Sequence, residues 1–278
     1  MSAISPTATL PRRSPLAVAS PLATLARRRF ELTARTPREL LVPLITPILF
    51  ALVIAPALKT ALQTGSAYES FVATGTIGLL IPLNTMFSGL SVIVDREVGA
   101  QRELLAAPVP RPLLVLGNLA VALAVTAFQV IALLGFALAR GIHFDANTFG
   151  IIWFVAAATL FTVGMYGVAE TLAGRVPKAE EYIARVPAIA IVPWFLAGSL
   201  FPITALPSFL EWFAKFLPLT HGLALVRYGL LSDSSGLHDI WSMNNTTAMA
   251  ALSLGVIAAF ALALTTVSIR VFTRTALR

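Results

Sequence analysis

The sequence contains no cysteine. This absence excludes disulfide bonds, thiolate metal sites and cysteine nucleophiles. Lysine is also rare, and no lysine stands in the GxxxxGK(S/T) spacing of a phosphate-binding loop, so the chain cannot bind ATP in that way. The three histidines are isolated, and neither the HExxH zinc motif nor the GxSxG nucleophile motif is present. We therefore predict no catalytic residue, no metal site and no cofactor bound by this chain.

Charged residues are scarce, at 12% of the 278 residues. Soluble domains carry about 25%. Hydrophobic residues make up 57% of the chain, and mean hydropathy is +0.84. This composition predicts an integral membrane protein. The net charge of +7 then indicates contact with anionic lipid headgroups and not with nucleic acid, because the positive charges cluster beside the hydrophobic runs.

Six apolar runs recur along the chain, and a helix needs about 20 such residues to cross a bilayer. We predict an all-α fold with six transmembrane helices, of which the fifth has the shortest apolar run. The predicted spans are 40–58, 71–94, 113–139, 149–172, 188–206 and 247–269.

The basic residues predict the orientation of these spans. With a cytoplasmic N-terminus, sixteen Lys and Arg residues fall on the cytoplasmic side and four on the other. This asymmetry places both termini in the cytoplasm of a multi-pass protein of the cell membrane.

The segment before the first span divides into two parts. Residues 1–21 are rich in Pro, Ser, Thr and Ala without periodicity, which predicts a disordered tail. Residues 22–38 predict an amphipathic helix in the membrane interface, at the start of one transmembrane domain that covers 22–278. Its apolar arc includes Phe30, its basic face includes Arg27, Arg28 and Arg35, and Arg29 alone breaks the separation. A solvated basic tail is the alternative.

A mixed-charge segment, Asp95 to Ala107, lies between the second and third spans. Asp95 is a good N-cap residue, and prolines follow the segment, so we predict a short cytoplasmic helix. Complementary charges could dock it into another protein. A solvated loop that closes a helical hairpin is equally compatible with these residues.

The segment from Pro187 to Arg227 interleaves prolines with aromatic residues. Such dense prolines forbid one continuous helix. We predict short re-entrant or outer-interface helices between the fifth and sixth spans, at a region of substrate exit. An aromatic belt without a transport role is the alternative.

Three polar residues, Asn84, Gln129 and Glu170, lie within predicted spans. Polar groups in a membrane usually face the interior of a helix bundle. Each therefore serves either a substrate path or the packing of helices through hydrogen bonds.

Two ordered motifs resemble those of the membrane subunit of type-2 ABC exporters, and within that family those of the daunorubicin-resistance type. The first is Asp95-Arg96-Glu97-Val98-Gly99, followed by the stretch from Glu103 to Arg111 and by Gly117. The second runs from Phe195 to Ile203, with Leu206-Pro207, then from Leu217 to His221, and ends at Arg227. Leu217 departs from the pattern, since we expect Asn there.

The resemblance implies an export permease for a lipophilic drug or lipid. Its implied partners are two copies of an ABC ATPase subunit, which carries the ATP and Mg, and a second permease subunit in a homo- or heterodimer. The cytoplasmic helix would transmit ATPase closure; the coupling residues would be Asp95, Arg96, Glu97, Gly99, Arg102 and Glu103. The substrate path would include Asn84, Gln129, Phe195, Gly198 and Phe201. An ion-coupled secondary transporter and a non-transporting assembly subunit are the alternatives.

Overall fold

The computed structural model describes residues 15–35, 37–63, 65, 67–101, 106 and 110–275. Every regular element in this part of the chain is a helix, which confirms the all-α prediction. The elements are α1 (Pro15–Ala34), α2 (Pro37–Leu49), the π-helix η1 (Phe50–Ile54), α3 (Ala55–Leu62), α4 (Ala67–Glu97), α6 (Arg111–Ala139), α7 (Thr148–Ala173), α8 (Ala179–Leu196), the 3-10 helix η2 (Ile203–Ala205), α9 (Ser208–Ala214), α10 (Pro218–Leu231), α11 (Ser235–Trp241) and α12 (Thr246–Thr275).

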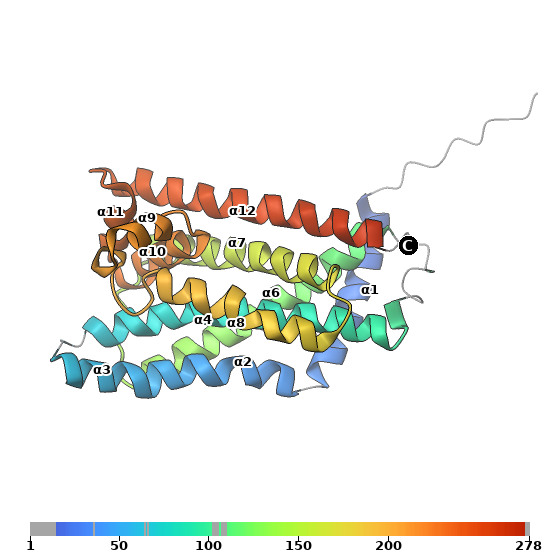
Figure 1. The fold of residues 1–278 in the computed structure, drawn as a ribbon, viewed down its shortest axis with the longest axis horizontal. Coiled ribbons are helices and arrows are strands. Elements are labelled where there is room, and N and C mark those ends of the chain that lie inside the picture. Colours follow the sequence, from blue (N-terminus) through green and yellow to red (C-terminus); the bar gives the residue numbers. More distant parts are fainter. Residues whose placement is uncertain are drawn as a thin grey trace, which may run out of the picture.

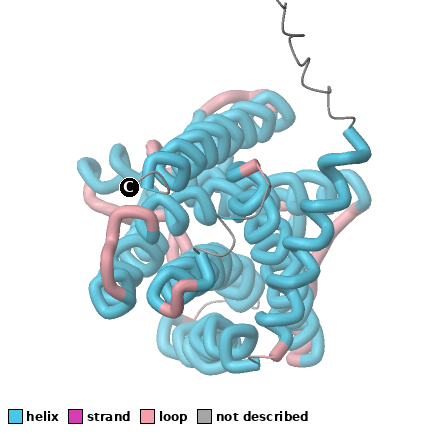
Figure 2. Tube along the Cα trace, turned by 90° about the vertical axis from the view of Figure 1, so that its right-hand side faces the viewer, coloured by secondary structure: helices cyan, strands magenta, loops and turns pink. Residues whose placement is uncertain are grey.

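The long helices run side by side along the longest axis of the molecule (Figure 1). Helix α1 lies across one end of this bundle, and α9, α10 and α11 gather at the other (Figure 1). We call these the α1 end and the α9 end. Seen from the α1 end, the long helices appear nearly end-on, with α1 along one side (Figure 2).

Five helical segments are long and apolar enough to cross a membrane: 41–62, Ala67–Glu97, Arg111–Ala139, Thr148–Ala173 and Thr246–Arg274. They correspond to five of the six predicted spans. The first of them combines α2, η1 and α3. Prolines inside and after α2 lack the N–H group that an α-helix requires, which explains why a π-helical turn interrupts this span.

The fifth predicted span is not among the helices of the described residues that are long and apolar enough to cross a membrane. Helix α8 covers Ala179–Leu196, whereas the prediction was 188–206. Its first half carries Glu180, Glu181 and Arg185, and its 18 residues make a helix about 27 Å long. Gly198 has a φ of +81° and turns the chain directly after α8, so residues 198–206 do not extend this helix.

Helix α1 begins at Pro15, earlier than predicted. Residues 15–21 are therefore helical and not part of a disordered tail, while residues 1–14 lie outside the described residues.

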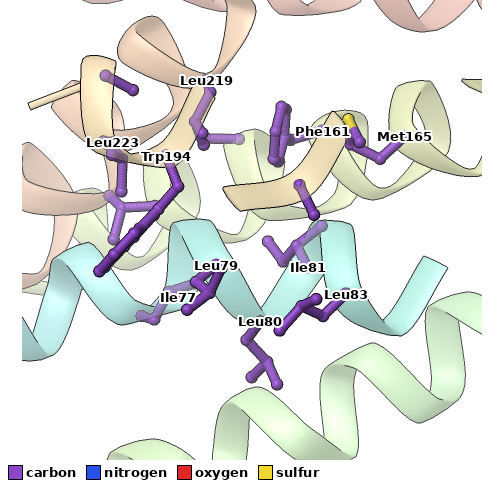
Figure 3. Packing of buried hydrophobic residues seen from close by; sticks show 14 of the residues in the cluster. Ile77, Leu79, Leu80, Ile81, Leu83, Phe161, Met165, Trp194, Leu219 and Leu223 are labelled. Atoms are coloured by element: carbon purple, nitrogen blue, oxygen red, sulfur yellow. The ribbon is translucent and has the colours of Figure 1, made fainter. Parts of the chain in front are cut away.

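Helix α4 is the centre of the bundle. Its Ile77, Leu79 and Leu80 are buried together with Phe161 of α7 and Leu223 of α10 (Figure 3). Helix α10 is buried along most of its length between α4, α7 and α12, although it is too short to cross a membrane. It begins within the proline-rich segment in which short helices were predicted.

Two aromatic donors fix α8 to α4. The Tyr182 hydroxyl donates to the Met86 carbonyl oxygen at 2.9 Å, and the indole Nε1 of Trp194 donates to the Gly75 carbonyl oxygen at 2.8 Å. Both side chains are fully buried. Such hydrogen bonds matter within a bilayer because lipid tails give helices little hydrophobic reason to associate.

Candidate functional site

The charged triplet of Asp95, Arg96 and Glu97 forms the last turn of α4 at the α1 end. Asp95 is therefore not the N-cap of a new helix, as the sequence suggested; it lies inside α4. The chain then turns at Gly99, whose φ of +82° favours glycine. Of the predicted coupling helix, Ala100, Gln101 and Ala106 are helical, and Arg102 and Glu103 lie outside the described residues.

Asp95 joins α4 to α1. The Nη1 atom of Arg29 lies 3.2 Å from Oδ2 of Asp95, and the two side chains are only 11% and 21% exposed. A pair this enclosed is costly to break, because the remaining partner would keep its charge away from bulk water. This contact also explains why Arg29 departs from the separation of faces on α1.

Arg96 joins α4 to the end of α7. Its guanidinium donates to the carbonyl oxygens of Ala173 and Pro177 at 3.0 and 3.1 Å, and also to that of Val176. The last carbonyl groups of a helix have no partner within the helix, and a cation at that end also complements the helix dipole. Arg96 therefore closes the end of α7 and holds the loop that leads into α8.

Glu97 contacts the start of α8. Its Oε1 accepts a hydrogen bond from the backbone N–H of Ala179, the first residue of α8, at 3.4 Å. Together the three side chains connect the end of α4 to α1, α7 and α8. We call Arg29, Asp95, Arg96 and Glu97 the α4 junction.

Helix α1 rests on α6 beside this junction. A Cβ atom at Gly117 would lie 3.1 Å from the Cβ of Leu25, so the absence of a side chain at Gly117 allows the close approach of the two helices. Phe30, Arg28 and Arg35 of α1 are exposed. Exposed Arg27 pairs with Glu31 at 2.8 Å and lowers the pKa of that carboxyl group.

A small cavity of about 30 Å³ lies between α1, α4, α6 and α12. Its polar lining consists of Arg28 and Arg29 of α1, Asp95 of α4, Asn118 of α6, and Gln101 of the segment after α4. Deeper in the bundle, the Tyr166 hydroxyl donates to Glu170 at 3.0 Å, and Asn118 hydrogen-bonds to Tyr166. Glu170 is thus hydrogen-bonded within α7.

The five residues predicted for a substrate path lie in α4, in α6 and around the turn after α8. Asn84 and Gln129 are buried. The Asn84 amide donates to the Thr126 hydroxyl and to the Ala122 carbonyl oxygen, so it connects α4 to α6. Phe195 and Phe201 are partly exposed at the α9 end, on either side of the turn at Gly198.

Sequence reasoning missed the roles of Tyr182 and Trp194 in fixing α8. The available signal was an aromatic side chain with a hydrogen-bond donor near each end of α8. It also did not pair Arg29 with Asp95, although Arg29 was the single charged residue on the apolar arc of its helix.

Comparison with known proteins identifies a family and several relatives that this chain resembles. A family model described as "ABC-2 type transporter" matches residues 21–231. The chain is similar to the "Putative transport permease ycf38" of Porphyra purpurea, with 24% identity over 209 residues, 73% of this chain and 72% of the relative. It is also similar to the "Inner membrane transport permease YadH" of Escherichia coli (strain K12), with 24% identity over 212 residues, 73% of this chain and 78% of the relative.

Proposed function

Because the chain belongs to the family of ABC-2 type transporters, we propose that it is the membrane subunit of an ATP-driven exporter. It moves a lipophilic drug or lipid out of the cell through the inner membrane, with both termini in the cytoplasm. The matched relatives named as transport permeases support this proposal. ATP is hydrolysed on a separate subunit.

The α4 junction is the observation that carries the proposal. Through Asp95, Arg96 and Glu97, a displacement of the end of α4 would be passed to α1, α7 and α8. A partner that pushes on this end, close to Gly99, would therefore move four helices as one body. The charged triplet would transmit this motion because it joins the helices. Glu97 and Arg28 are exposed, so the ATPase could contact them.

The complex would contain two copies of this chain, or this chain and a related one, above two ATPase subunits. ATP and Mg belong to the ATPase subunits. Substrate would leave at the α9 end, where Phe195 and Phe201 give apolar surface beside the turn at Gly198. Asn84 contributes to this path by holding α4 against α6.

A proton-coupled transporter is less well supported. Such a transporter normally requires several ionisable groups within the membrane as a relay. Among the described residues, Glu170 is the only buried carboxylate, and it is hydrogen-bonded to Tyr166 of its own helix.

Purification of this chain from its native membrane tests the proposal. We expect mass spectrometry to find an ATPase with a phosphate-binding loop in stoichiometric amount, and lipophilic cargo to stimulate ATP hydrolysis. A photoreactive cargo should label the α9 end near Phe195 and Phe201 more than the exposed Phe128 on α6. A chain that purifies alone and moves substrate without ATP would contradict the proposal.

A further inference from the structure

A buried arginine lies in α10 at the α9 end, far from the α4 junction (Figure 1). Arg227 of α10 is 4% exposed. Its guanidinium carbon lies 3.5 Å from the centre of the Phe71 ring, a cation–π contact. Its Nη2 donates to the carbonyl oxygen of Ser199 at 3.1 Å and to that of Phe71 at 3.4 Å.

These contacts join three elements that are distant in the sequence. Phe71 lies near the start of α4, Ser199 lies in the turn after α8, and Arg227 lies in α10. The turn is itself held in place, because the buried Ser199 hydroxyl donates to the Trp194 carbonyl oxygen at 2.6 Å. We call Arg227, Phe71 and Ser199 the arginine clasp.

The clasp leaves the guanidinium incompletely satisfied. Its direct partners are an aromatic ring and two carbonyl oxygens, and its buried Nε has no hydrogen-bond partner. Buried polar groups are normally paired, so an exception needs an explanation. The charges of Asp233 and Asp239 both favour the charged form of this guanidinium, and Asp239 of α11 lines the same cavity of about 20 Å³ as Arg227.

We propose that the arginine clasp holds the α9 end in its closed arrangement, and that this end opens when Arg227 leaves Phe71 and Ser199 for Asp239. Arg227 is then a positioning residue with two alternative sets of partners. The contacts alone show that α4, the turn after α8 and α10 are held together. Release of cargo through this opening rests on the proposed function.

The test measures the α9 end directly. Because the chain has no cysteine, the double variant Ala67→Cys and Phe209→Cys carries spin labels only at exposed sites at the start of α4 and in α9. Distances between the labels are measured by electron spin resonance with the permease alone in lipid nanodiscs. Arg227→Lys should shift the distribution to longer distances and broaden it, because an ammonium cannot both stack on the ring and reach two carbonyl oxygens.

Further variants separate a clasp from a general loss of structure. Phe71→Leu should broaden the distribution as Arg227→Lys does, whereas Phe71→Trp, which retains the cation–π contact, should leave it unchanged. Asp239→Asn should narrow the distance distribution, because Arg227 then has no carboxylate partner in the open arrangement. The control is Arg140→Lys, at an exposed arginine of the same end.

The same distribution in Arg227→Lys, Phe71→Leu and the parent chain would overturn the proposal. If Arg227→Lys does not fold, Phe71→Leu and Phe71→Trp test the proposal instead, and the same distance distribution in both would overturn it. The experiment uses neither ATPase nor cargo. The clasp proposal can therefore be contradicted while the ATPase still co-purifies. It can also be supported in a chain that purifies alone.

Discussion

At the scale of the residue, Arg96 has the most connections in the α4 junction. It donates to three carbonyl oxygens at the end of α7 and in the following loop. Arg96→Gln should lower the export achieved per ATP hydrolysed about tenfold, because a loss of ~1.4 kcal/mol in coupling free energy corresponds to that factor. Transport and hydrolysis are measured together in proteoliposomes. Arg175→Gln, at an exposed arginine of the same loop, is the control; equal ratios in both variants would contradict a coupling role for Arg96.

At the scale of the element, α7 and α12 approach each other at Gly167. A Cβ atom there would lie 2.7 Å from the backbone carbon of Leu264, so a methyl group must separate the helices. Gly167→Ala should therefore destabilise the protein by about 1–3 kcal/mol, the usual cost of overpacking. The midpoint of thermal unfolding in detergent should fall. Gly255→Ala is a matched control on α12, where a Cβ meets nothing within 4 Å, and a similar fall there would show that close packing is not the cause.

At the scale of the whole molecule, the number of crossings depends on α8. This helix lies alongside α4 (Figure 1). We predict that it makes a sixth crossing, which would put both termini on one side of the membrane. A membrane-impermeant maleimide should then label Phe209→Cys and Asp145→Cys from outside the cell but not Lys178→Cys; these three sites are exposed in the structure. The cysteine-free parent chain gives no background. Labelling of Lys178→Cys and Phe209→Cys from the same side would show that α8 does not cross.

The sequence by itself determined the elements whose cause is local. Five spans follow from apolar length, because a bilayer imposes the same thickness on every crossing. The short helices between α8 and α12 follow from prolines that cannot continue a helix. The end of α4 could not be placed in this way. Asp95 has the residue type of an N-cap but lies within a helix that continues to Glu97 and contacts α1, α7 and α8 there.

The tertiary structure alone decided which polar groups meet. Arg29 with Asp95, Asn84 with Thr126, and Arg227 with Phe71 each join residues that lie far apart in the sequence. Hydropathy and helical period describe only near neighbours along the chain. A polar side chain that is buried between helices needs a partner on a neighbouring helix. The packing of helices therefore determines which polar residues form the α4 junction and the arginine clasp. The sequence shows that these residues are present but not which of them are in contact.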